Sequence, residues 1–451
     1  MSALKQYIDL FRDHRDIIDS HSAPAINALR RRAFDALDGV ELPKPGADNY
    51  ENTDLETMLS PDYGLNIARL NIDVNPAATF HCDVPRISSH PFIVINDSYV
   101  ENPRTYEGLP EGVEVGSLKE FALKDPATFA HFYGKEADMA NPMVALNTLL
   151  AQDGFYLRVK KGVRIEKPLQ LVNILQNGMP LMAVRRLLVI IEDNASAKLL
   201  VCDHTQNPDL EFLSLETVEI FVGENAEFDF YNLEESTVKT QRISTLYLAQ
   251  KRDSRVVIDG ITLYNGTTRN EYYCRFEGEN ASLRLLGMGI EDECRKVSTY
   301  SRIDHAVPRC HSDELFKFSI DEEARGAFTG RIYVAEGAVK TEAYQSNRNL
   351  VGSDTARMES KPELEIYNDD VKCSHGSAIG QLDPLQMFYM RTRGIDEQTA
   401  LLLLKQAFMA DIIDGVRVEA LRDRLHLLVE RRFAGAVSAC ASCAGCNKLP
   451  E

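Results

Sequence analysis

The chain has 451 residues, a net charge of −18, 44% hydrophobic residues and 26% charged residues. These values are typical of a globular protein with two or three domains. The acidic balance argues against a nucleic-acid-binding protein, which needs a basic surface, and no apolar run is long enough to predict a membrane span. The nine cysteines are mostly scattered singly, which predicts reduced thiols in the cytoplasm rather than a disulfide framework.

Residues 1–150 are expected to form a mostly helical N-terminal region with a few short strands. Apolar residues recur at helical spacing in two stretches before residue 40, and a further helix is predicted around residues 141–150. Arg30, Arg31 and Arg32 lie inside the second stretch. In so acidic a chain we interpret them as a solvated helix face rather than an anion-binding patch.

Residues 151–378 carry a different pattern, in which short β-rich runs follow one another. Three of these runs are preceded by similar turns that end in Asn-Ala, with Ala195, Ala226 and Ala281 lying 31 and 55 residues apart. A step near 28 residues fits this spacing, and residues 252–255 occupy the place of one degenerate copy. A repeat made of strands and one tight corner predicts a stacked solenoid, although an all-β sandwich also has short strands and turns.

Residues 379–435 are predicted to form a C-terminal helical domain. Asp383 and Pro384 can begin a first helix, and Asp396 can cap a second one. Leu401, Leu404, Phe408 and Ile412 would form one apolar stripe on that second helix, and a last helix is expected over about 416–433.

The segment 436–451 is expected to be a flexible tail that carries Cys440, Cys443 and Cys446. Their Cys-x₂-Cys-x₂-Cys spacing is that of half of an iron–sulfur or zinc site, but a fourth ligand is missing. The sequence is compatible with two alternatives, a tail that binds a metal or cluster and a flexible tail that binds none.

Cys373 and His375 stand between the β-rich region and the C-terminal helices. If this segment is a strand, the two side chains point to the same face, where they would offer half of a site for iron or zinc. Asp369 and Asp370 precede them and are candidates either to accept a hydrogen bond from the imidazole or to cap the strand end. Without further context, a Cys-x-His pair also fits an ordinary structural role.

The residues around this pair resemble the C-terminal signature of the SufB/SufD family. The Cys-Ser-His-Gly form at residues 373–376 is similar to the SufD branch, and the resemblance is continuous from about residue 304 to about 408. The segments that carry it are Lys361–Tyr367, Asp369–Gly376, Gly380–Asp383, Lys340–Gln345, Asn347–Leu350 and Phe388–Ile395.

This resemblance implies a right-handed parallel β-helix, a flattened solenoid, with helical regions on both sides. It also implies a scaffold of iron–sulfur cluster assembly rather than an enzyme, paired with a SufB-like chain. A SufC-like ATPase would dock on the helices over 384–433, at residues such as Phe388, Tyr389 and Arg393. Iron would bind, or a transient iron–sulfur cluster would form, at the shared interface. His375 would be the first-choice ligand and Cys373 the second. No nucleotide is expected on this chain, since it has no phosphate-binding loop.

Two alternatives remain. The chain could form a homodimer that handles iron without a SufB-like partner, because a homodimer and a heterodimer would use the same strand edge. A β-helix enzyme acting on carbohydrate could employ Asp369 and Asp370, but the absence of tryptophan argues against a sugar-binding groove.

Overall fold

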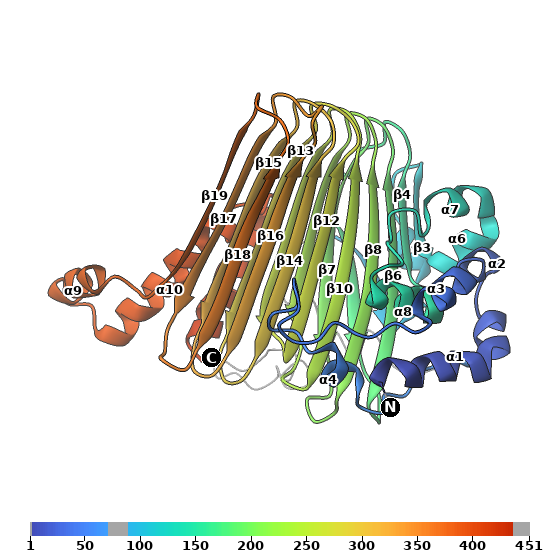
Figure 1. Cartoon of the computed structure of the whole chain (residues 1–451), viewed down its shortest axis with the longest axis horizontal. Helices are drawn as coiled ribbons and strands as arrows, with labels where there is room; N and C mark the ends of the chain where they lie inside the picture. The colour runs from blue at the N-terminus through green and yellow to red at the C-terminus, as the bar shows by residue number, and fades with distance from the viewer. Residues whose placement is uncertain (1, 71–88, 436–451) are drawn as a thin grey trace.

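The computed structural model describes residues 2–70 and 89–435, and the chain is mainly β (Figure 1). Its strands form two stacked sheets. The first, in spatial order, consists of β19 (Lys372–Gly380), β17 (Glu342–Val351), β15 (His311–Ile320), β13 (Ser282–Glu291), β11 (Arg255–Tyr264), β9 (Glu227–Glu235), β7 (Ser196–Thr205), β5 (Leu169–Leu175), β1 (His90–Ile95) and β2 (Ser98–Val100). The second consists of β18 (Arg357–Ile366), β16 (Arg325–Val334), β14 (Lys296–His305), β12 (Thr267–Phe276), β10 (Thr240–Gln250), β8 (Phe212–Val222), β6 (Leu181–Ile191), β4 (Phe155–Val159) and β3 (Val113–Ser117).

Helices precede and follow the solenoid strands in the sequence. They are α1 (Ala3–Ser20), α2 (Pro24–Asn27), α3 (Arg30–Leu37), α4 (Leu55–Leu59), the 3₁₀ helix η1 (Pro103–Tyr106), α6 (Leu118–Lys124), α7 (Pro126–Phe132), α8 (Pro142–Leu150), α9 (Pro384–Thr392), α10 (Glu397–Ile413) and α11 (Glu419–Phe433). None of the described helices is long and apolar enough to cross a membrane.

Consecutive strands from β4 onward alternate between the two sheets, so each strand from β6 to β17 pairs in parallel with the strand two before it and the strand two after it. Val256 in β11, for example, is aligned with Phe228 one coil earlier and Leu283 one coil later. This pattern is that of a solenoid, and the predicted parallel β-helix core with helical flanks is confirmed.

The corners explain the repeated turn in the sequence. Asn194, Asn225 and Asn280 have φ between 53° and 60°, a left-handed conformation that Asn tolerates better than most residues. The degenerate copy keeps the same geometry, with Asp253 at φ 60°. The alanines that follow the three asparagines are at most 1% exposed, because they turn inward at the bend.

The N-terminal helices cover the outer face of the nine-stranded sheet around β6 to β10, where α1, α3 and α8 share one apolar cluster with it. The expectation for Arg30 was wrong. Its side chain is 1% exposed, donates to the carbonyl oxygens of Leu149 and Ala151, and lies 3.0 Å from a carboxylate oxygen of Asp19. Arg30 therefore joins α3 to the end of α8 instead of facing solvent.

The C-terminal helices α10 and α11 cover the outer face of the ten-stranded sheet around β7 to β13. The predicted caps are present, since Asp383 and Asp396 each accept a backbone N–H at the start of α9 and α10. The predicted apolar stripe is only partly buried. Ile412 is inaccessible but Leu401 is 38% exposed, because α9 and the first turns of α10 project beyond the sheet (Figure 1).

Candidate functional site

Cys373 and His375 lie on β19, the last strand of the solenoid, which pairs with β17 and stands at the end of its sheet. They are aligned with Ala343 and Gln345, whose side chains face the interior and are 0% and 3% exposed. Both predicted ligands therefore point toward the space between the two sheets, as the strand spacing predicted. Because no further described coil covers them, His375 is exposed and Cys373 is half-buried.

The thiol of Cys373 packs against the end of the apolar core. Burial raises its pKa above the usual value, and a hydrogen bond with the Ala343 backbone opposes this shift. The neutral thiol is therefore favoured near neutral pH, and it must lose its proton before the sulfur can bind a metal. This chemistry supports the imidazole as the stronger of the two candidate ligands.

The two carboxylates before the pair lie in the corner between β18 and β19, five and six residues from His375. Asp370 is engaged there, with its carbonyl oxygen accepting from the Lys340 amide at 2.6 Å and its carboxylate 3.2 Å from the Lys340 ammonium. A strand rises about 3.3 Å per residue, so Asp369 and Asp370 lie well away from the imidazole along the strand. In this structure Asp369 and Asp370 therefore fit a role in capping the start of β19.

The interior of the last coils becomes polar after β15, since Asn347 and Asn349 on β17 are aligned with the buried rings of Phe316 and Phe318. Ser360 of β18 donates to Asn347 at 2.6 Å, and its hydroxyl lies 2.6 Å from that of Ser377 on β19. Below His375, Gln345 donates from its side-chain nitrogen to Glu314 at 2.7 Å. The sequence carries no local signal for these polar contacts, because hydrogen bonds across coils join residues far apart in the chain.

Glu314 is fully buried on β15. Burial raises its carboxyl pKa to about 7, and hydrogen bonds with Ser301 and Gln345 counteract part of the rise. A carboxyl with such a pKa changes charge near neutral pH, which is uncommon for a residue in a protein interior.

His305 and Cys310 are two further residues of types that bind metals, and both lie in the interior with hydrogen-bond partners. His305 is buried, its Nε2 lies 2.9 Å from the Ser312 hydroxyl, and burial lowers its pKa to about 3. Cys310 is buried and donates to the Gly278 carbonyl oxygen at 3.4 Å. Among the described residues, no group of three or more His, Cys, Asp or Glu side chains could hold a metal ion. Cys440, Cys443 and Cys446 lie outside the described residues.

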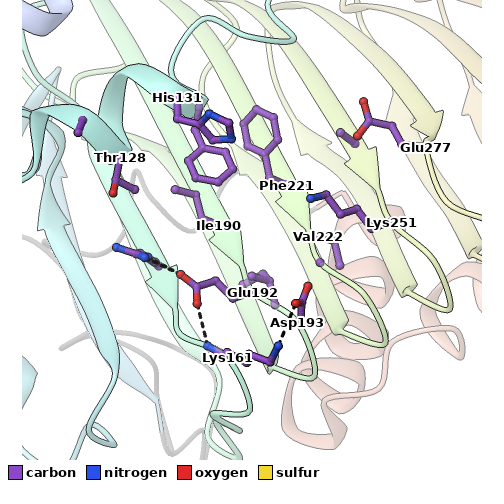
Figure 2. Close-up of a pocket in the computed structure, with 16 residues that line it drawn as sticks. Thr128, His131, Lys161, Ile190, Glu192, Asp193, Phe221, Val222, Lys251 and Glu277 are labelled. Atoms are coloured by element: carbon purple, nitrogen blue, oxygen red, sulfur yellow. Dashed lines mark hydrogen bonds and ion pairs between the residues drawn. The ribbon is translucent and has the colours of Figure 1, made fainter.

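A hollow of about 510 Å³ lies beside α7 on the outer face of the nine-stranded sheet (Figure 2). Its charged side chains include two close pairs, with Lys161 3.4 Å from Asp193 and Arg158 2.6 Å from Glu192. The hollow spans β4 to β10, whereas β18 forms the opposite edge of that sheet. It is therefore separate from the site on the last coil.

The projecting C-terminal helices carry an exposed apolar patch. Leu385, Phe388 and Tyr389 on α9 are 75%, 65% and 58% exposed, and Leu403 on α10 is 42% exposed. The guanidinium of Arg393 lies 5.1 Å from the centre of the Tyr389 ring. Exposed aromatic and aliphatic side chains gathered on one element are typical of a protein-binding surface.

Comparisons with known proteins agree along nearly the whole chain. A family model described as "SUF system FeS cluster assembly, SufBD core domain" matches residues 174–408, and one described as "SufBD protein N-terminal region" matches residues 1–171. An iron–sulfur cluster assembly SufBD family protein of Synechocystis is 28% identical over 411 residues, 89% of this chain and 90% of that protein. The iron–sulfur cluster assembly proteins SufD of Escherichia coli and Bacillus subtilis are 27% and 24% identical, over 87% and 92% of this chain and 90% and 95% of theirs.

Proposed function

The chain belongs to the SufBD family of the SUF system for iron–sulfur cluster assembly, and from this premise we propose that it is the SufD-type scaffold subunit. In this role it pairs with a SufB-like chain through the last coil of its solenoid. Its C-terminal helices bind a SufC-like ATPase, with the exposed apolar patch on α9 and α10 as the contact surface. Iron and a nascent cluster are cargo at the shared interface, where His375 is the ligand from this chain. The chain itself acts as a scaffold and not as an enzyme.

The main support for pairing with a SufB-like chain is the exposed edge of the last coil. β18 and β19 each end a sheet, and their outer backbone groups have no strand partner among the described residues. Such an edge is a template for pairing with another chain. Ile366, Tyr367 and Ile379 are 39%, 60% and 49% exposed at this end, so apolar contacts would add to strand pairing.

The cargo role of His375 is supported by its position on that edge. A neutral imidazole suits iron, and a ligand shared between two chains releases its cargo when the chains move apart. Cys373 is the second candidate, and its half-buried thiol would ionise only once a metal or a partner favours the thiolate.

The first test is anaerobic co-purification with a SufB-like and a SufC-like chain, followed by iron and sulfide analysis of the complex. His375→Ala should leave the complex intact and lower its iron and sulfide content several-fold. Ser374→Ala is the matched control, because Ser374 is the adjacent exposed residue and points to the opposite face of β19. Unchanged cargo in the His375 variant would contradict the ligand role.

A second test addresses the strand edge. The backbone N–H of Lys372 donates to Thr341, which precedes β17. Along a strand, successive backbone N–H groups point to opposite edges, so the N–H of Ile379, seven residues later, points to the free edge of β19. Ile379→Pro should therefore weaken pairing with the SufB-like chain without removing a bond to β17, whereas Ile379→Ala should affect pairing less. If a complex forms only between two copies of this chain, the homodimeric alternative replaces the heterodimer.

A third test addresses the exposed apolar patch on α9. Phe388→Glu should reduce retention of the SufC-like ATPase, because it places a charge in the centre of the exposed apolar patch on α9. Leu123→Glu is the control, since Leu123 is 50% exposed on α6, outside the C-terminal helices. Equal retention of the ATPase by both variants would place its docking surface elsewhere.

A further inference from the structure

Gln345 occupies the position directly below His375 in the ladder of inward-facing side chains. Glu314, Gln345 and His375 are aligned partners on β15, β17 and β19. Neighbouring strands lie about 4.8 Å apart, so the Gln345 amide and the imidazole are within reach of one another on the same face. Gln345 is 3% exposed whereas His375 is exposed, which places the amide between the interior and the open end.

The Gln345 amide has a fixed orientation. Its nitrogen donates to a Glu314 oxygen at 2.7 Å, which turns the amide nitrogen toward the interior. Gly330 faces the same amide, and a Cβ at residue 330 would collide with the Gln345 nitrogen and with the Phe328 ring. The glycine thus provides the space in which this orientation fits.

The amide oxygen of Gln345 is buried and has no hydrogen-bond partner among the residues that the structure describes. At the same end, the Ser377 hydroxyl lies 2.6 Å from that of Ser360 and the Asn347 amide nitrogen donates to the Phe316 carbonyl oxygen, while the Asn349 amide oxygen is a second buried acceptor without a partner among the described residues. A buried acceptor without a donor is uncommon in a folded protein and calls for an explanation. The side chain next in the ladder is His375, whose ring carries an N–H donor in either neutral tautomer.

We propose that Gln345 is the positioning residue for His375. Its amide oxygen accepts the N–H of one ring nitrogen, and the other nitrogen is left unprotonated to bind ferrous iron or the nascent cluster at the partner interface. Histidine ligands commonly donate their second ring N–H to an oxygen acceptor, which fixes both the tautomer and the ring orientation. The inference rests on the proposed cargo role of His375 and adds Gln345, held by Glu314 and Gly330, as its support.

The test measures ferrous iron affinity of the complex with the SufB-like and SufC-like chains under anaerobic conditions. Gln345→Met keeps the length of the side chain but removes the acceptor, and should lower affinity by roughly 10-fold to 100-fold. Exchanging the two interior groups in the double variant Glu314→Gln, Gln345→Glu retains an acceptor oxygen at residue 345 and should restore affinity. Complex formation should be unchanged in both.

A glycine pair tests the same idea without altering the ladder. Gly330→Ala should displace the Gln345 amide and lower iron affinity, whereas Gly337→Ala should not, because a Cβ at residue 337 meets nothing within 4 Å. A spectroscopic measurement gives a second readout. The ¹⁵N signals of His375, assigned by their loss in His375→Ala, should show one neutral tautomer in the wild-type complex and a mixture in Gln345→Met.

The outcomes separate the two proposals. If His375→Ala lowers iron affinity and Gln345→Met and Gly330→Ala do not, the role of Gln345 is overturned and the role of His375 stands. Failure of the exchanged double variant to restore affinity in a folded complex would also overturn it. If His375→Ala leaves iron affinity unchanged, the cargo role fails and the inference fails with it.

Discussion

The two ends of the solenoid are built from the same repeat but finished differently. At the first coils, short antiparallel strands, β2 and β3, occupy the sheet edges, and the N-terminal helices pack over the nine-stranded sheet (Figure 1). At the last coil, the outer edges of β18 and β19 have no strand partner within residues 2–70 and 89–435, and the Ser360 and Ser377 hydroxyls join the two strands. A solenoid needs a closure at each end. This chain supplies one closure itself, and in the proposed function a partner chain supplies the other.

The buried ion pair at the covered end gives the largest expected effect. Arg186 and Glu219 lie 2.5 Å apart with both side chains 0% exposed, and Glu219 also accepts the backbone N–H groups of Gly134 and Ala137. Glu219→Ala would leave a buried guanidinium unpaired, which should cost about 3–5 kcal/mol of unfolding free energy. Urea denaturation followed by circular dichroism measures this loss.

The control for that prediction is Glu224→Ala, in which the lost partner is Arg252. This pair is 3.0 Å apart, but its side chains are 49% and 60% exposed, so its loss should cost less than about 1 kcal/mol. Similar costs for the two variants would show that the covered end is not held by its buried ion pair.

Glycines in the interior and at the bare end should respond differently to the same substitution. A Cβ at Gly287 would collide with the Phe316 ring, whereas a Cβ at Gly380 meets nothing within 4 Å. Gly287→Ala should therefore destabilise the chain by about 1–3 kcal/mol and Gly380→Ala by less than about 0.5 kcal/mol. Thermal and urea unfolding check this. An equal loss in both variants would mean that the last coil is packed as tightly as the middle ones.

A smaller, pH-dependent effect is expected under the C-terminal helices. Asp259 is fully buried on β11, and within the described part of the chain neither of its carboxylate oxygens has a hydrogen-bond partner. Burial raises its pKa to about 8. The folded chain therefore keeps this proton up to about pH 8, whereas the unfolded chain loses it near pH 4. Stability falls as pH rises through that window and levels off above it.

Asp259→Asn should remove this loss. The variant should be more stable than the wild type at pH 8, by on the order of 1 kcal/mol, and closer to it at pH 5. Unfolding midpoints at the two pH values measure the difference. Asp313→Asn, an exposed carboxylate on β15, serves as control, and the same pH response in that variant would disprove the assignment to Asp259.

Local patterns were sufficient for much of this structure. The Asn-Ala corners predicted the coil step, because a left-handed turn with a small inward residue restricts which side chains fit. The i, i+2 spacing predicted that Cys373 and His375 share a face. The sequence did not predict that Arg30 is buried, because its partners Leu149 and Ala151 are more than 100 residues away.

By itself, the sequence determined the repeat, the class of fold, the caps of the C-terminal helices and the two candidate ligands, since each depends on residues close together in the chain. The tertiary structure decided which strand edges remain bare and which helix face is exposed. It also decided that Gln345 and Glu314, 30 and 61 positions before His375, stand in line beneath it. Such neighbours come from the stacking of coils, and only the register between strands fixes them.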